Sequence, residues 1–339
     1  MSAGGTPTEG TAAGGTAAGG TAAGGTAAGG TAAGGTAAGG TAAGGTAAGG
    51  TAAGGTAAGG TAAGGTAAGG TVAGRLSWLL LGVLVLAQIG YPLTGGADRA
   101  RLTIATVCLG WLLSVSHALL TRGPRVAAGL VLVTTGGGLA VEALGVATGV
   151  PFGGYSYSGE LGPKLAGVPL IIPLAWTWMA WPAWLAAVRL TRPGAARIAL
   201  AAVGLAGWDL FLDPQMVAEG YWSWRDPDPA LPGVPDVPVS NYLGWLVFAV
   251  LLMALLGPVA GRAAGLAADW DAPMHVLYLW TYAGSVLAHA VFLDLPASAG
   301  WGGLAMAVVA LPLAWKEGAL LQQKTIRGGP SLHTDRSAG

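Results

Sequence analysis

The sequence predicts an all-α membrane protein, a polytopic bundle of about eight transmembrane helices that follows a disordered N-terminal repeat tail. Composition gives the class, because 53% of the 339 residues are hydrophobic, 9% are charged and the mean hydropathy is +0.60. From Leu76 onward, apolar runs recur with close to the roughly 20 residues that a helix needs to cross a bilayer. The fifth run contains aspartates and the eighth is short, so these two are the weakest. The runs cover residues 77–93, 102–120, 126–148, 168–190, 197–217, 241–257, 274–294 and 300–315.

The chain begins with a low-complexity segment, residues 1–75, that we expect to be disordered. Twelve perfect copies of Thr-Ala-Ala-Gly-Gly fill residues 11–70, and a degenerate copy ends at Arg75. This short period offers no apolar face of useful size, and its glycines make a regular helix costly in entropy. The predicted organisation is therefore the repeat tail, a transmembrane domain at 76–320 and a cytoplasmic C-terminal tail at 321–339.

Charge in the connections orients the bundle, because cytoplasmic loops collect Lys and Arg. Of the 15 basic residues, eleven fall at the two chain ends and in the connections after the second, fourth and sixth runs. The other four are Arg99, Arg101, Lys164 and Arg225. We therefore expect a multi-pass protein of the cell (cytoplasmic) membrane with both termini in the cytoplasm. The formal net charge of zero gives no electrostatic footprint for nucleic acid, so we expect no nucleic-acid partner.

Two stretches rich in aromatic and polar residues, 151–176 and 208–245, interrupt the apolar pattern and should open on the outer face. Carboxyl groups gather at the same depth. Ionisable residues at membrane depth usually point into the bundle and serve function. Apolar surroundings disfavour the charged form of a carboxyl, and a protonated carboxyl is a usable general acid. The carboxyl residues near the outer ends of their runs are Glu142, Asp209, Asp213 and Asp294.

The spacing of Asp209 and Asp213 allows two local structures. On a continuous helix the two side chains would stack on one face about a turn apart and form a paired-carboxylate site. Alternatively, Asp213 followed by Pro214 is the pattern of a helix N-cap with proline at the first helical position, which would start a short separate helix. Asp209, beside Trp208 inside an apolar run, has no such structural explanation, so we expect it to be functional.

Aromatic residues and one amide near these carboxyls are candidates for substrate binding. Tryptophan faces that line a cavity stabilise a carbocation, and tyrosine hydroxyls or an amide hold water. The structural alternative is that the aromatic residues form interfacial belts and that the amide caps the sixth helix. No pair of histidines has convincing metal-ligand spacing, so no metal site is expected. The candidates are Tyr155, Tyr157, Trp176, Trp208, Tyr221, Trp222, Asn241, Tyr242 and Trp245.

The order and spacing of three motifs resemble a known family. They are Pro151-Phe-Gly-Gly-Tyr-Ser-Tyr157, Trp208-Asp209 with Asp213-Pro214 and Gly220-Tyr-Trp-Ser-Trp224, and Val239-Ser-Asn-Tyr-Leu-Gly-Trp245. Over roughly residues 76–320 the chain resembles the polytopic carotenoid biosynthesis proteins that act as carotenoid 1,2-hydratases, including the bisanhydrobacterioruberin hydratases of haloarchaea. The connector Arg225–Pro238, rich in proline and aspartate, departs from the family pattern.

The resemblance implies a hydro-lyase without cofactor that adds water to the terminal C=C of an acyclic carotenoid. Protonation of the double bond gives a tertiary carbocation, which water captures as an alcohol. The implied roles are Asp209 as the acid and Asp213 or Glu142 as the group that orients water. The implied partners are the acyclic carotenoid, water, the lipid bilayer and other membrane enzymes of carotenoid synthesis.

Two other classes of function stay open. Asp209 and Asp213 have the Asp-x-x-x-Asp spacing with which membrane prenyltransferases hold magnesium and a diphosphate. The predicted outer face, however, is poor in the Lys and Arg that a diphosphate site also needs. A carotenoid-binding or transport component would instead use buried carboxyls as proton-relay groups.

Overall fold

The computed structural model describes residues 48–49, 52–53, 58–260 and 268–328. The chain divides into two units, Met1–Val72 and Ala73–Gly339. In the first unit, the strands β2 (Ala48–Gly49) and β3 (Ala52–Ala53) pair in parallel. Much of the predicted disordered tail, and most of the predicted C-terminal tail, lie outside the described residues. Helix α1 (Ala58–Gly90) begins inside the repeats, before the domain boundary that the sequence predicts.

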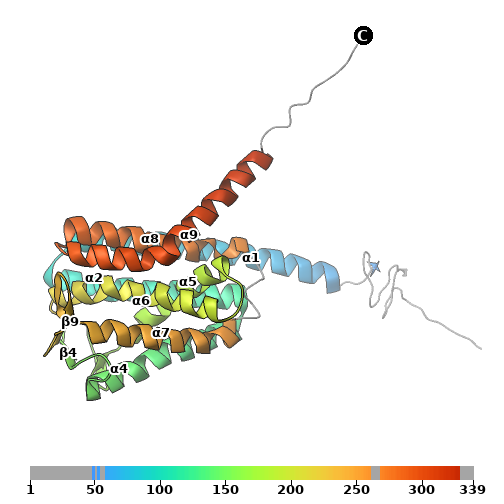
Figure 1. Cartoon of the computed structure of the whole chain (residues 1–339). Coiled ribbons are helices and arrows are strands. Elements are labelled where there is room, and N and C mark those ends of the chain that lie inside the picture. The colour runs from blue at the N-terminus through green and yellow to red at the C-terminus, as the bar shows by residue number, and fades with distance from the viewer. Residues whose placement is uncertain (1–47, 50–51, 54–57, 261–267, 329–339) are drawn as a thin grey trace, which may run out of the picture. The chain divides into compact units, whose positions relative to one another are not determined.

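The second unit is a helical bundle, as predicted (Figure 1). Helical segments follow the apolar runs in order, and π-helical turns interrupt the third and seventh of them. After α1 and η1 (Tyr91–Leu93), the segments are α2 (Gly96–Arg122), α3 (Pro124–Leu130), η2 (Val131–Gly136), α4 (Gly137–Thr148), α5 (Ile172–Leu190), α6 (Ala195–Ala218), α7 (Val239–Ala260), η4 (Ala268–Asp271), α8 (Ala272–Leu287), η5 (Ala288–Phe292) and α9 (Pro296–Gly328).

The expected count of eight membrane spans is not confirmed. Among the described residues, six helical segments are long and apolar enough to cross a membrane, judged by length and composition. The fifth and eighth runs, which looked weakest in sequence, are among the six, whereas α5 and α8 are not. Helix α8 is too short before its π-helical turn, and α5 is less apolar because of its tryptophans and prolines. The six are Gly74–Leu93, Gly96–Arg122, Pro124–Thr148, Ala195–Ala218, Val239–Ala260 and Pro296–Leu320.

Helix α5 is the centre of the bundle. It packs against α2, α6 and α8, and fourteen of its nineteen residues are buried. In Figure 1, α8 and α9 lie on one side of the α2, α5 and α6 layer, and α4 and α7 lie on the other. A helix that is shielded by its neighbours touches little lipid, so it does not need the hydropathy of a lipid-facing span.

Helix α6 continues through Pro214, so of the two local structures that the sequence allows, the helix cap at Asp213 is wrong. Proline has no N–H and leaves the carbonyl four residues earlier, that of Leu210, without its helical donor. The hydroxyl of Ser298 on α9 donates a hydrogen bond to this carbonyl at 2.7 Å. Because a neighbouring helix supplies the missing donor, the helix does not break, and Asp209 and Asp213 lie on one face about a turn apart.

The two polar-aromatic stretches meet at one end of the bundle through a small antiparallel sheet. Strand β4 (Tyr155–Tyr157) pairs with β7 (Trp222–Trp224), with Ser156 opposite Ser223. Side chains alternate across a sheet, so both serines are exposed on one face and the four aromatic side chains share the other. The expectation that both stretches open on the same face of the bundle is therefore confirmed.

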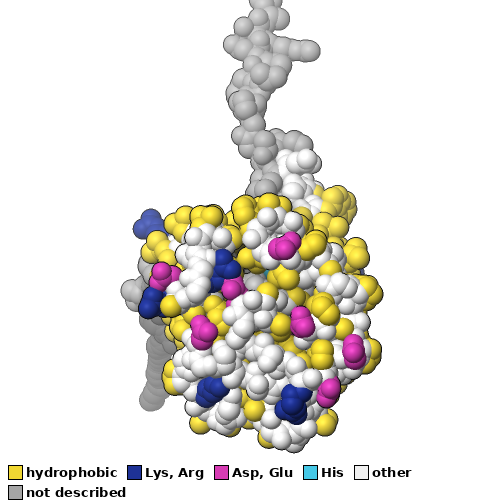
Figure 2. Space-filling model, turned by 90° about the vertical axis from the view of Figure 1, so that its left-hand side faces the viewer, with side chains coloured by type: hydrophobic (Ala, Val, Ile, Leu, Met, Phe, Trp, Pro, Cys, Tyr) yellow, Lys and Arg dark blue, Asp and Glu magenta, His cyan; other side chains and the backbone are white. Residues whose placement is uncertain are grey.

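Short hairpins complete this end of the bundle. The connector Arg225–Pro238, which departs from the family pattern, forms strands β8 (Ala230–Leu231) and β9 (Val234–Pro238), and the indole of Trp301 donates to the carbonyl of Pro232 at 3.1 Å. Strands β5 (Lys164–Leu165) and β6 (Val168–Pro169) form another hairpin. Figure 2 views this end, where basic and acidic side chains are scattered among uncharged ones.

Candidate active site

Three of the four candidate carboxyls line one small cavity beneath the β4–β7 sheet. Its volume is about 60 Å³, and the side chains of Glu142, Asp209 and Asp213 are buried in its wall. We call it the carboxyl chamber. A buried polar cavity of this size has room for a few water molecules. Of the other predicted site residues, Tyr155, Tyr157, Trp176, Trp208, Trp222, Asn241 and Trp245 also line it.

Glu142 is held by two phenols from β4. The hydroxyl of Tyr155 donates to Oε2 at 2.8 Å, and the hydroxyl of Tyr157 donates to Oε1. The strand pairing fixes both tyrosines on the inner face of the sheet, while α4 presents Glu142 from below. Both carboxyl oxygens of Glu142 therefore accept hydrogen bonds, which fix the orientation of its carboxyl group.

The two tyrosines lie in a loop outside the spanning helices, and burial is the main reason that the pKa of each is raised above its ordinary value of 10.0. The negative charge of the neighbouring Glu142 raises both pKa values further. At neutral pH both phenols are therefore protonated and donate to Glu142.

The two aspartates of α6 differ in their contacts. Asn241, from the first turn of α7, donates through Nδ2 to Oδ2 of Asp213. Asn241 therefore contacts one of the candidate carboxyls and lines the chamber. Asp209 has one oxygen, Oδ2, that is buried and has no hydrogen-bond partner among the described residues. Buried polar atoms usually have a hydrogen-bond partner, so Asp209 differs from Glu142 in having an oxygen whose hydrogen-bonding capacity is unused.

Aromatic rings form most of the remaining wall. Trp176 and Trp245 lie with ring centroids 4.3 Å apart, and Trp178 meets Trp208 edge to face at 5.3 Å. Indole faces attract cations, and they exclude bulk water from a site. The chamber thus combines acid groups with a wall that tolerates positive charge.

Two predicted residues lie elsewhere. The side chains of Tyr221 and Tyr242 do not line the chamber, although the backbone carbonyl of Tyr221 accepts a hydrogen bond from Ser158 N at 2.8 Å and joins the two stretches. Asp294, expected at the same depth as the other carboxyls, is exposed and lies outside the chamber. Conversely, Trp178 and Thr103 line the chamber and were not singled out as site residues.

The described wall residues of the chamber include no Lys or Arg. Among the described residues, no group of three or more His, Cys, Asp or Glu side chains is arranged to hold a metal ion. The chamber's chemistry as it stands is that of neutral phenols, an amide, indoles and three carboxyls.

Comparison with known proteins agrees with this description. A family model for carotenoid biosynthesis proteins matches residues 102–309, which include every residue of the carboxyl chamber. The chain belongs to the carotenoid biosynthesis protein family. One relative of this carotenoid biosynthesis protein is the bisanhydrobacterioruberin hydratase of Haloarcula japonica, which is 38% identical to it over 128 residues. That match covers 35% of this chain and 41% of the relative, so it spans less than half of either protein. No solved structure matches the chain.

Proposed function

We propose that this carotenoid biosynthesis protein adds water to the terminal double bond of an acyclic carotenoid, as a 1,2-hydratase. The observation that carries the proposal is the pairing of Asp209, with one oxygen unpartnered, and Glu142, with both oxygens held by phenols, in one aromatic-walled chamber. Acid-catalysed hydration needs a proton donor, a proton acceptor, a water and protection of a cation. The name of the Haloarcula relative supports the reaction class.

The first step uses Asp209 as general acid. Its proton passes to the less substituted carbon of the terminal double bond, and the π electrons of that bond form the new C–H bond. The other carbon becomes a tertiary carbocation beside Trp176, Trp208 and Trp245, whose faces stabilise it. Asp213 lies one turn after Asp209 on α6. The hydrogen bond from Asn241 on α7 holds the Asp213 side chain in place beside the acid.

The second step uses Glu142 as general base. A water held by the carboxylate attacks the cation, its oxygen forms the C–O bond, and its proton passes to Glu142. The net change is the addition of one water, and transfer of the proton from Glu142 back to Asp209 through the chamber restores the enzyme. No redox change occurs, so the reaction as written consumes no cofactor.

The same chamber is a poor diphosphate site. A magnesium-dependent prenyltransferase would need cationic side chains near the phosphates, and the described chamber wall has none. Asp213 is also engaged by Asn241, which competes with metal ligation. These contacts favour hydration over the alternative that the Asp-x-x-x-Asp spacing suggests.

The test is a pigment analysis of a lycopene-producing host. The host expresses the full chain as the wild type, as the Asp209→Asn variant or as the Glu142→Gln variant. We expect the wild type to add water, a gain of about 18 mass units per modified end, and each variant to lose at least about 100-fold in product. Asp294→Asn is the matched control, because Asp294 is exposed, lies outside the chamber and has a φ of 57° that asparagine also adopts. Full activity of Asp209→Asn at equal membrane abundance would refute its role as the acid. A wild type that leaves lycopene and longer acyclic carotenoids unchanged would refute hydration and favour transfer or transport.

A further inference from the structure

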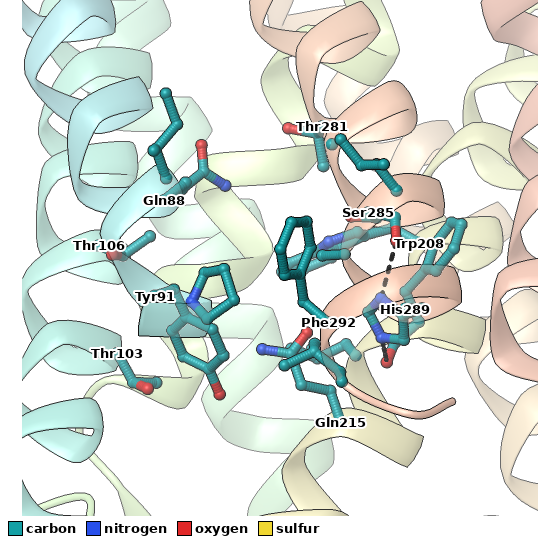
Figure 3. A pocket seen from close by; sticks show the side chains of 18 of the residues that line it. Gln88, Tyr91, Thr103, Thr106, Trp208, Gln215, Thr281, Ser285, His289 and Phe292 are labelled. Carbon is teal, nitrogen blue, oxygen red and sulfur yellow. Dashed lines mark hydrogen bonds between the residues drawn. The ribbon is translucent and has the colours of Figure 1, made fainter. Parts of the chain in front are cut away.

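A second and larger cavity adjoins the carboxyl chamber. Its volume is about 410 Å³, and its wall comes from α1, η1, α2, α5, α6, α8 and η5. In Figure 3, Gln88, Tyr91 and Thr106 lie on one side of it, and Thr281, Ser285 and Phe292 lie on the other. We call it the apolar cavity. It shares six wall residues with the carboxyl chamber: Thr103, Val107, Trp178, Trp208, Leu212 and Met216.

The rim of the apolar cavity faces the surroundings of the bundle. Ile89 and Leu93 near the end of α1, and Leu287 and Phe292 on the α8–η5 segment, line the cavity and are exposed. The span Gly74–Leu93 is also the least buried of the six, at 22%. Exposed apolar side chains at membrane depth contact lipid, so the cavity opens toward the bilayer between α1 and α8.

We propose that the apolar cavity binds the polyene chain of the substrate and receives it sideways from the bilayer. The end of the polyene chain that enters first then reaches the carboxyl chamber, where its terminal double bond lies. This inference rests on the proposed function, since it names the path by which a carotenoid would reach Asp209. The occupant is a linear apolar chain because the wall is largely apolar and continuous with the acid groups at one end and with lipid at the other.

The junction between the two cavities lies at Trp178 and Trp208. These indoles meet edge to face at 5.3 Å and belong to both walls. A chain that passes them presents its end to Asp209 and the bonds just behind that end to the indole faces. The positive charge that forms near the chain end is therefore beside aromatic rings.

Two features shape the outer part of the cavity. Gly284 on α8 has no side chain, and a Cβ there would meet the Trp280 ring at 3.6 Å or more, which is ordinary contact. The indole of Trp280 donates to Oε1 of Gln88 at 3.1 Å and joins α8 to α1. A larger side chain at position 284 therefore fits the backbone but fills space that the polyene would use.

The volume of the cavity limits how much of the substrate it holds. About 410 Å³ lies toward the lower end of the range for pockets that enclose a drug-sized ligand. A long carotenoid would therefore insert one end and leave the remainder in lipid. The enzyme then acts on one end at a time, and a product hydrated at one end precedes any product hydrated at both.

The experiment fills the cavity away from the carboxyls. In the lycopene-producing host, we expect Gly284→Phe to lower hydrated product at least about tenfold at equal membrane abundance, because the added ring occupies the polyene path. Ala283→Phe is the matched control, since Ala283 is the neighbour of Gly284 on α8, is exposed and does not line the cavity. Thr106→Phe fills the cavity from the opposite wall, on α2, in case Gly284→Phe does not accumulate.

Binding is measured separately from activity. Purified Asp209→Asn protein should retain lycopene from the host membrane, and adding Gly284→Phe to it should reduce the retained lycopene at least about fivefold, while adding Ala283→Phe should not. If Gly284→Phe and Thr106→Phe both gave as much hydrated product and retained as much lycopene as the protein without them, the cavity assignment would be overturned. The proposed hydration would be unaffected. Absence of hydration in the wild type, with retention still lost on Gly284→Phe, would instead overturn the proposed reaction and support the binding site.

Discussion

Tyr155 and Tyr157 connect the acid chemistry to the pH dependence of stability. Burial, and then Glu142, raises the pKa of both phenols above 10.0 in the folded protein. A group with a raised pKa in the folded state stabilises that state fully below the unfolded pKa, and the stabilisation is lost as pH rises toward the folded pKa. We therefore expect the unfolding temperature in detergent to fall between about pH 10 and pH 11.5, and to fall less in the Tyr155→Phe/Tyr157→Phe variant than in the wild type. Melting curves at pH 8 give the reference, and equal declines in the two proteins would contradict the assignment.

Residue type alone predicted part of the site. Glu142 and Asp209 stood out because a carboxyl inside an apolar run is costly unless it serves function, and both line the carboxyl chamber. Trp178 was missed because it is one of four tryptophans on α5, and only the packing of α5 against α6 decides which of them meets Trp208. Tyr221 belongs to the Gly220–Trp224 motif, but it precedes strand β7, and its buried side chain does not line the chamber.

At the scale of the element, Gly145 determines how closely β4 approaches α4. It lies three residues after Glu142, and a Cβ at this position would be 2.7 Å from Phe152 Cδ2 and 2.8 Å from the Tyr155 hydroxyl oxygen. Gly145→Ala should therefore displace Tyr155 from Glu142 and lower hydration by at least about tenfold, because small displacements of catalytic groups are costly.

The control for Gly145→Ala lies on the same candidate membrane span, Pro124–Thr148. At Gly136, a Cβ would meet its nearest neighbour, Leu132 Cδ1, at 3.8 Å, so Gly136→Ala should leave activity unchanged. Equal activity of the two variants in the pigment assay would show that the packing of Tyr155 on α4 does not position Glu142.

At the end of the bundle opposite the carboxyl chamber, a buried ion pair joins the end of α2 to the start of α8. Arg122, at the end of α2, donates through Nη2 to both oxygens of Asp271 at 2.7 Å, just before α8. Removing one partner of a buried pair leaves the other charge uncompensated, so Asp271→Ala should lower the free energy of unfolding by about 3–5 kcal/mol. Asp98→Ala removes the exposed partner of Arg101 and should have little effect. Denaturant unfolding in detergent checks this, and similar stabilities of the two variants would contradict it.

Element boundaries were less predictable than element order. The pattern Asp213-Pro214 indicates a helix start when it is judged locally, and it fails here because Ser298, 84 positions after Pro214 and on another helix, satisfies the carbonyl of Leu210. The order of helices, by contrast, follows from hydropathy alone. Local signals thus predict what a segment prefers, and a distant partner decides whether a broken hydrogen bond is tolerated.

For the molecule as a whole, hydropathy predicted a membrane bundle but overcounted the spans that meet a length and composition criterion. Helix α5 shows the reason. Its tryptophans and prolines lower its hydropathy, and it is nevertheless the most central helix because α2, α6 and α8 cover it. Hydropathy measures compatibility with lipid, and a central helix is surrounded by protein. Two of the four tryptophans that weaken the signal of α5, Trp176 and Trp178, line the carboxyl chamber.

The orientation of the bundle is the remaining property of the whole molecule that the sequence predicts, since eleven of the 15 basic residues fall on the side assigned to the cytoplasm. The exposed Glu160, in the loop after β4, and the exposed Gln322, near the end of α9, report the two sides. In a Cys108→Ser background, which removes the native cysteine, we expect Glu160→Cys to react with a membrane-impermeant maleimide on intact cells and Gln322→Cys to react after permeabilisation. The reverse pattern would place the carboxyl chamber at the cytoplasmic end of the bundle, so the proton and water of the proposed reaction would be exchanged with the cytoplasm.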